Sequence, residues 1–309
     1  MKENFRNRTG ACVVRALLWP YRRLPLRFHY AMGRALSWFL ERVARYRRDI
    51  VITNISRSFP EKKYAEVKHI ASQFYHHLGR IAAEAVWFGG CQGKRGAARL
   101  HRSAMVRITN AADLDALQAE RPVVLLCGHN GNWELLGGFF NFRYDSVPWS
   151  IRPEDCAVVY RRLKSRFWDS MLALNRCAPL EQTAFDAYLE TRETLRYAIA
   201  NRSERKVYIL PSDQYPFSGT ARCQVGEFLH QETKAMSGPA SLASRFGTAV
   251  VYTRWRTASD GTSRVTFETI AKDASGLPPE DIMKHYYKLL EEDIREEPWN
   301  YLWSHKRWK

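Results

Sequence analysis

The residues best suited to chemistry are His129 and Glu134, which lie five positions apart in an apolar stretch. On one continuous helix this spacing places two side chains about 140° apart around the axis, so they would diverge. If His129 lies in a turn and Glu134 in the next helical turn, the carboxylate can accept the proton on one imidazole nitrogen. The other nitrogen then accepts a proton from a substrate hydroxyl. The pair predicts general-base catalysis by His129, oriented by Glu134.

The segment around His129 predicts the end of a buried strand. Residues 123–127 are consecutively apolar, which is typical of a strand buried on both faces. Residues 128–132 predict a turn that caps a following helical segment. His129 is therefore expected where open α/β sheets bind their ligands, at the carboxyl end of a central strand. The structural alternative is a histidine bonded to a backbone carbonyl, with Glu134 in solvent.

Cys127 is a second candidate nucleophile, because it lies two residues before His129. In an extended strand the two side chains share a face but lie about 6–7 Å apart, so we interpret Cys127 as part of the core. The six cysteines are scattered and form no Cys-x-x-Cys motif, which indicates reduced thiols. We expect no metal site and no cofactor.

The charge of the chain is strongly uneven. The 309 residues carry a net charge of +16, and residues 1–50 contain twelve basic but only three acidic side chains. Such a basic region favours an anionic partner, which can be a nucleic acid, an anionic lipid surface or an acidic carrier protein.

Residues 11–45 alternate apolar side chains with arginines. No run of about 20 uncharged residues occurs, so a membrane-spanning helix is not expected. A basic helix with Trp and Phe on its other side is typical of a helix that lies in a membrane interface. The alternative is a helix packed on its own domain with a solvated arginine face.

Predicted strands alternate with predicted helices along most of the chain. The expected strands are 105–109, 123–127, 157–160, 207–210, 249–255 and 264–270, and the expected helices are 61–88, 111–119, 163–176, 185–201, 235–246 and 279–297. Residues 215–234 show no clear periodicity and predict a long loop. The pattern indicates an α/β fold with a mostly parallel central sheet flanked by helices. A glycine-rich connector suggests a helical, basic region over 1–96 and an α/β core over 97–309.

Several short motifs occur in a characteristic order over nearly the whole chain. They are Arg47-Arg48 with Asn54, Ser58-Phe59-Pro60-Glu61, Gly128-His129 with Glu134, Tyr160-Arg161, Pro211-Ser212-Asp213-Gln214, Gly238-Pro239-Ala240, and the ending Trp299–Trp308. In this order and spacing the chain resembles the late acyltransferases of lipid A biosynthesis, within the lysophospholipid acyltransferase superfamily.

This resemblance implies a glycerolipid acyltransferase-like fold and an enzyme at the cytoplasmic face of the bacterial inner membrane. It implies transfer of a fatty acyl chain from acyl carrier protein to a hydroxyl of a lipid A precursor. His129 would be the base, Glu134 would orient it, and the hydroxyl would attack the thioester directly. Relatives in the superfamily acylate lysophospholipids, glycolipids or aminolipids, so another lipid acceptor stays open.

Five further residues are candidates for binding the substrates. Arg161 follows a strand and suits a lipid phosphate, although a surface ion pair is the alternative. Asp213 and Gln214 end another strand and can orient head-group atoms or Arg161, or they form only a turn and a helix cap. The backbone N–H groups of Asn130 and Gly131 can face the thioester oxyanion.

The basic pairs Arg22-Arg23, Arg47-Arg48, Arg161-Arg162 and Lys306-Arg307 are candidate contacts with acyl carrier protein or anionic lipid, or ordinary solvated charges. Phe217, Phe228 and Leu229 line an acyl channel or belong to the core.

The composition and the expected α/β fold are also compatible with two other classes of protein. A nucleic-acid-binding protein fits the charge, but the sequence has no Cys/His finger, no glycine-aromatic RNA-binding signature and no helix-turn-helix pattern. A serine hydrolase lacks its Gly-x-Ser-x-Gly elbow here. We therefore expect no nucleic-acid partner and no serine nucleophile.

Overall fold

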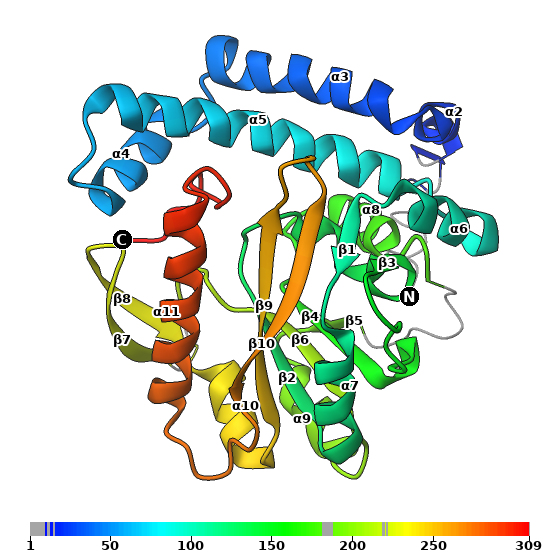
Figure 1. Cartoon of the computed structure of the whole chain (residues 1–309), viewed down its shortest axis with the longest axis vertical. Coiled ribbons are helices and arrows are strands. Elements are labelled where there is room, and N and C mark those ends of the chain that lie inside the picture. Colours follow the sequence, from blue (N-terminus) through cyan, green and yellow to red (C-terminus); the bar gives the residue numbers. More distant parts are fainter. Residues whose placement is uncertain are drawn as a thin grey trace.

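The centre of the molecule is an eight-stranded sheet with the strand order β3-β1-β10-β9-β2-β6-β4-β5 (Figure 1). The computed structural model describes residues 10, 13–14, 16–180, 188–217, 220 and 222–308. Among neighbouring strands of this sheet, β9 and β10 are antiparallel and the other pairs are parallel. The predicted α/β fold with a mostly parallel central sheet flanked by helices is confirmed.

The elements have the following bounds. The strands are β1 (Val106–Ile108), β2 (Val123–Cys127), β3 (Arg143–Tyr144), β4 (Cys156–Tyr160), β5 (Tyr188–Glu190), β6 (Val207–Pro211), β7 (Arg222–Phe228), β8 (Gln231–Met236), β9 (Ala249–Thr257) and β10 (Ser263–Ala271). The α-helices are α2 (Trp19–Arg23), α3 (Leu26–Trp38), α4 (Arg48–Ser58), α5 (Tyr64–Phe88), α6 (Gly93–Ser103), α7 (Ala111–Glu120), α8 (Arg166–Arg176), α9 (Thr194–Ala200), α10 (Gly238–Phe246) and α11 (Pro279–Glu296). A π-helical segment η1 (Phe39–Val43) and 3₁₀ segments η2 (Trp133–Asn141) and η3 (Pro153–Asp155) complete the structure.

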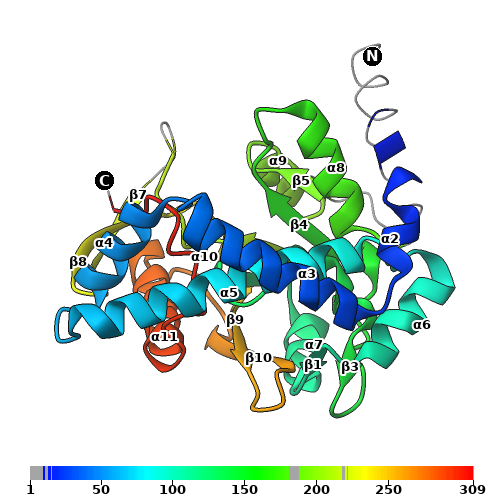
Figure 2. The same ribbon diagram turned by 90° about the horizontal axis from the view of Figure 1, so that it is seen from above.

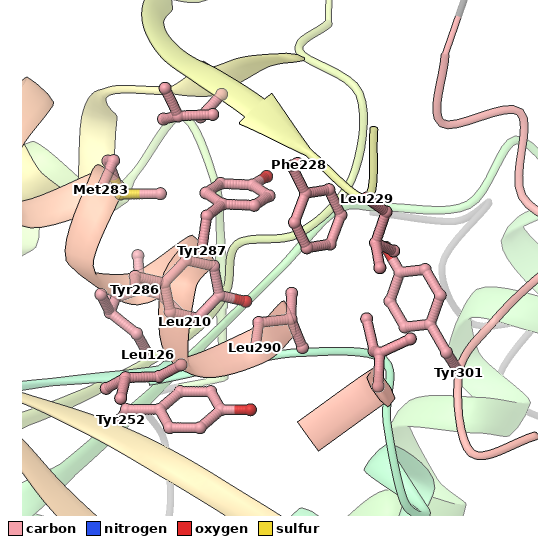
Figure 3. Packing of buried hydrophobic residues seen from close by; sticks show 14 of the residues in the cluster. Leu126, Leu210, Phe228, Leu229, Tyr252, Met283, Tyr286, Tyr287, Leu290 and Tyr301 are labelled. Atoms are coloured by element: carbon pink, nitrogen blue, oxygen red, sulfur yellow. The ribbon is translucent and has the colours of Figure 1, made fainter. Parts of the chain in front are cut away.

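Strand β2 lies between β9 and β6, and all its side chains are buried, as its apolar run predicts. Val124 and Leu126 belong to the apolar cluster that includes α10 and α11. Figure 3 shows this cluster, in which Leu126 and Leu210 pack with tyrosines of α11. The intervening side chains of β2 belong to a second cluster on the other face, with η2, α6 and α7. The two clusters fix β2 between layers of helices.

The N-terminal helices lie on one side of the molecule, where α3 and α5 run side by side (Figure 2). A Cβ added to Gly79 would meet the carbonyl oxygen of Gly33 at 2.3 Å, so the absence of side chains allows this close approach. Within the described residues, no helix combines the length and the apolar character needed to cross a bilayer. Helix α6 spans residue 96, at which we expected the helical region to end.

Two expected elements differ from the structure. The expected helix 185–201 begins within 181–187, outside the described residues, and it is then interrupted by strand β5 before α9 begins. The expected loop 215–234 contains the antiparallel hairpin β7-β8. Its turn places Leu229 and His230 at φ values of 52° and 60°, a left-handed conformation that usually selects Asn or Gly. The usual hairpin signal is therefore missing from the sequence.

Candidate active site

His129 and Asp213 meet because β2 and β6 are adjacent parallel strands. Cys127 is aligned with Pro211 in the register, and each candidate residue follows two positions later. The Asp213 carboxylate accepts a hydrogen bond of 3.0 Å from the backbone N–H of His129 and lies 2.6 Å from its Nδ1. The carboxylate thus fixes both the backbone and the ring of His129.

Asp213 is only 2 % exposed. Burial raises the pKa of this carboxyl, but the charge and hydrogen bonds of His129 outweigh burial and hold the pKa below its ordinary value. A buried carboxylate accepts hydrogen bonds and cannot donate them, so the imidazole carries a proton on Nδ1. In the neutral imidazole the lone pair is then on Nε2, and this is the nitrogen that can act as a base.

Gln214 occupies the other side of the imidazole. Its Nε2 lies 3.1 Å from Nε2 of His129, so the amide N–H donates to the basic nitrogen. The ring of Trp133 lies 5.0 Å from the imidazole ring, between centroids. His129, Gln214 and Trp133 all line the same large cavity. The predicted residues His129, Asp213 and Gln214 therefore form one contiguous group.

Glu134 does not make the hydrogen bond to His129 that we expected. Its two carboxylate oxygens accept bonds of 2.7 and 2.6 Å from the guanidinium of Arg176 on α8. Asn132 caps η2 by accepting the backbone N–H of Glu134, and the segment directs the carboxylate toward α8. Arg176 also donates to the hydroxyl of Tyr188 at 2.8 Å. Glu134 thus anchors α8 to the His129 segment, and Asp213 takes the place expected for it.

The turn after His129 is held from behind. The side-chain amide of Asn130 donates toward the hydroxyl of Tyr252 and the carboxylate of Asp293, at 3.4 and 3.5 Å, and the residue is buried. The backbone N–H of Gly131 donates to Oδ1 of Asn300 at 2.6 Å. Because this N–H already has a partner, Gly131 does not provide the oxyanion donor that we expected. The side chain of Asn130 is directed away from the cavity.

The cavity has a volume of about 1160 Å³. Its apolar part includes Leu136, Phe140, Val158, Leu180 and Ile209, and its basic part includes Arg161, Arg162, Lys164, Arg222 and Arg245. None of the lining residues, within the described chain, is an aspartate or a glutamate. A cavity with these two parts can hold an apolar chain and an anionic group side by side.

Arg161 lies in this cavity, as its position after β4 predicts. Its guanidinium lies 3.7 Å from the centroid of the Phe217 ring. This stacking leaves the edge of the guanidinium available for the paired hydrogen bonds that phosphates accept. Of the three apolar residues considered for an acyl channel, Phe217 lines the cavity, whereas Phe228 and Leu229 are fully buried in the core.

Two of the four basic pairs contain a buried arginine. Arg22 is 4 % exposed and donates to Asn175, and Arg307 is 2 % exposed and donates to the carbonyl of Lys234 and the hydroxyl of Tyr287. Arg47 donates to the carbonyl of Ser304. Arg22 and Arg307 are therefore held inside the structure and are not available as surface contacts, whereas the side chain of Arg47 is exposed.

Cys127 is buried, and burial raises the pKa of its thiol to about 12. A thiol with so high a pKa carries little thiolate at neutral pH, and the thiolate is the nucleophile. The structure therefore supports a packing role for Cys127.

His305 was not a candidate from the sequence. It lines the cavity, and its Nε2 accepts the backbone N–H of Tyr215 at 3.3 Å, next to Gln214. The amide of Asn54 on α4 donates to the carbonyl oxygens of Trp303 and His305. The C-terminal segment is thus held by α4 and in turn holds the Asp213-Gln214 segment. The sequence carried one signal of this contact. Asn54 and the ending Trp299–Trp308 both belong to the set of motifs on which the family resemblance rests.

The family of bacterial lipid A biosynthesis acyltransferases matches residues 6–309. No individually curated protein matches the sequence. A match over almost the full length, together with a strand-end histidine at a cavity that is part apolar and part basic, identifies the chain as a member of the bacterial lipid A biosynthesis acyltransferase family, an O-acyltransferase.

Proposed function

We propose that this acyltransferase moves a fatty acyl chain from an acyl carrier protein thioester to a hydroxyl of a lipid A precursor, with His129 as general base. The observation that carries the proposal is that His129, which lines the cavity, is paired with the buried carboxylate of Asp213 behind it. Asp213 orients the ring and stabilises the imidazolium that forms in the transition state. In this mechanism Asp213, and not Glu134, orients the base.

The chemical step begins at the unprotonated Nε2 of His129. The acceptor hydroxyl displaces the amide of Gln214, donates its proton to Nε2, and attacks the thioester carbonyl. The tetrahedral intermediate collapses by breaking its C–S bond, and the imidazolium returns the proton to the leaving thiolate. The amide of Gln214, displaced from Nε2, is then a donor for the oxyanion.

The cavity suits both substrates of this reaction. Its basic part offers Arg161, Lys164 and Arg222 to the phosphate groups of a lipid A precursor. Its apolar part, around Leu136 and Phe140, offers a volume for the acyl chain.

Membrane association is proposed from the outer surface of α3 and η1. Five apolar side chains follow one another there at intervals of three or four residues: Phe28, Met32, Leu36, Phe39 and Val43, between 38 % and 55 % exposed. Such an exposed stripe on a basic helix fits the boundary between headgroups and acyl chains. We propose that the enzyme lies on the cytoplasmic face of the inner membrane through this stripe.

The acyl carrier protein is proposed to approach α9. Arg192, Leu195, Arg196, Ile199 and Arg202 are exposed at helical spacing, and Leu195 also lines the cavity. These three arginines make no ion pair within the described chain, so they are free to attract an acidic protein. Figure 1 shows α3 along the top and α9 near the bottom, which leaves α9 accessible when α3 rests on lipid.

The test is acyl transfer by purified protein in detergent, with acyl carrier protein as donor and a lipid A precursor as acceptor, read by mass spectrometry. We expect His129→Ala to lower kcat on the order of 10²–10⁴-fold, which is the usual contribution of a general base. His230→Ala is the matched control, because His230 lies on the exposed hairpin turn. Full transfer by His129→Ala would refute the mechanism. If the enzyme acylated a different lipid, the proposed acceptor would be wrong, and the proposed role of His129 would be unaffected.

A further inference from the structure

A second cavity, of about 350 Å³, lies between η1, the start of α4 and the first half of α5. Helix α4 and this half of α5 are at the upper left in Figure 1. It shares no lining residue with the cavity at His129. Five basic side chains and a single acidic one line it: Arg42, Arg45, Arg48, Lys68 and His69, with Glu41. We call this cavity the basic groove.

The acidic residue does little to neutralise the basic groove. Glu41 lies 3.8 Å from Arg42 and also accepts a hydrogen bond from Ser72. Arg45, Arg48 and Lys68 make no ion pair among the residues that the structure describes. Several unpaired cations around one hollow create a strongly positive local potential, which attracts an anion.

The turn that carries Arg45 and leads to Arg48 is strained. Arg45 and Arg47 have φ values of 46° and 51°, in the left-handed region that arginine rarely adopts. Hydrogen bonds on both sides hold this turn: the N–H of Tyr46 donates to Leu40, and the hydroxyl of Tyr75 donates to the carbonyl of Tyr46. Strain that the surrounding structure enforces in this way is typical of functional sites.

The surroundings indicate the kind of ligand. Guanidinium groups suit phosphate oxygens, with which they form paired, charge-assisted hydrogen bonds. Phe39 and Val43, which belong to the exposed apolar stripe, lie on η1 beside Glu41 and Arg42 of the groove. A ligand with a phosphate next to an acyl chain satisfies both features at once.

We propose that the basic groove binds the phosphate of an anionic membrane phospholipid, at a site separate from the active site. The inference rests on the proposed membrane contact of α3 for the source of the lipid. It does not depend on acyl transfer. Bound there, the lipid would fix the position of η1 and α4 on the membrane surface.

The test is co-flotation of the purified full-length protein with phosphatidylcholine vesicles, with and without phosphatidylglycerol. We expect the double variant Arg48→Gln/Lys68→Gln to lose at least tenfold in partitioning onto anionic vesicles, since each basic residue near an anionic surface contributes on the order of a fivefold factor. Arg57→Gln/Arg95→Gln is the control, because it removes the same charge from exposed positions outside the groove. Equal losses in the two double variants would overturn the proposal in favour of unspecific attraction.

Four more measurements separate the remaining outcomes. Binding of wild-type protein to neutral vesicles measures the apolar stripe alone, and transfer activity in detergent, expected to be unchanged by Arg48→Gln/Lys68→Gln, measures the active site. Arg45→Gly relieves the left-handed strain and removes one cation, so we expect a higher Tm together with weaker binding to anionic vesicles. Titration with inorganic phosphate is the last arm. Saturable binding of phosphate with no vesicle preference would overturn the assignment to a lipid.

Discussion

The carboxylate of Asp213 bonds both the backbone N–H and the ring Nδ1 of His129, at 3.0 and 2.6 Å. One buried side chain thus sets the position of the catalytic loop and the tautomer of the proposed base. The partner comes from the neighbouring strand, 84 residues further along the chain.

Asp213→Asn tests this relationship. An amide cannot stabilise the imidazolium as a carboxylate does, so we expect kcat to fall on the order of 10²–10⁴-fold. KM for both substrates should change little, since Asp213 is buried and is not part of the cavity wall. Steady-state kinetics will separate the two parameters, with Asp281→Asn on the exposed start of α11 as control. A rise in KM at constant kcat would contradict the role.

The pair of Glu134 and Arg176 is expected to act mainly on stability. Their side chains are 14 % and 27 % exposed, so removing one partner leaves a partly buried charge. We expect Glu134→Gln to lower the free energy of unfolding by about 2–3 kcal/mol, a value reduced for this partial exposure. Denaturation of Glu134→Gln, Arg176→Met and the double variant should give a smaller loss for the double variant than the sum of the two.

The same variants separate the roles of the two carboxylates. At a temperature where both proteins are folded, Glu134→Gln should retain a higher kcat than Asp213→Asn. If Glu134→Gln were the slower enzyme, the motif carboxylate would act on the base after all.

His77 makes the stability of the protein depend on pH. Burial lowers the pKa of this histidine to about 3, and its ring packs edge to face on Trp299. Below pH 6.5 the unfolded chain binds a proton at His77 and the folded chain does not, so the free energy of unfolding falls as the pH falls. One such group contributes about 1.4 kcal/mol per pH unit between pH 6.5 and the folded pKa.

His77→Phe should remove this contribution. We expect the variant to lose less stability than the wild type between pH 6.5 and 5, as measured by chemical denaturation at each pH. Parallel pH dependences in the two proteins would show that His77 is protonated in the folded state.

Cys127 is expected to be unreactive. Because burial raises the pKa of its thiol to about 12, iodoacetamide at pH 8 should leave Cys127 unmodified while the more exposed Cys223 reacts. Cys127→Ala should keep kcat within about threefold, since the thiol takes no part in the reaction. Mass spectrometry of tryptic peptides measures the first result. A trapped acyl-enzyme on Cys127 would contradict the second.

Local sequence determined many of the elements and the position of His129 at the end of a strand. The apolar run 123–127 predicted β2, the helical periodicity of 61–88 predicted α5, and the turn at 128–132 placed His129 at the end of a strand. These features can be predicted from residues that are close in the chain. A strand buried on both faces is a run of apolar residues, and a helix has apolar residues at intervals of three and four.

Only the tertiary structure decided which groups meet. The sequence does not specify that β6 lies beside β2, and that neighbourhood brings Asp213 to His129. Likewise, α8 packs against η2, and Glu134 therefore pairs with Arg176. Along the chain Glu134 is much closer to His129 than to Arg176. Strand order and helix packing are set by the complementary surfaces of distant segments, and a single sequence carries no local record of them.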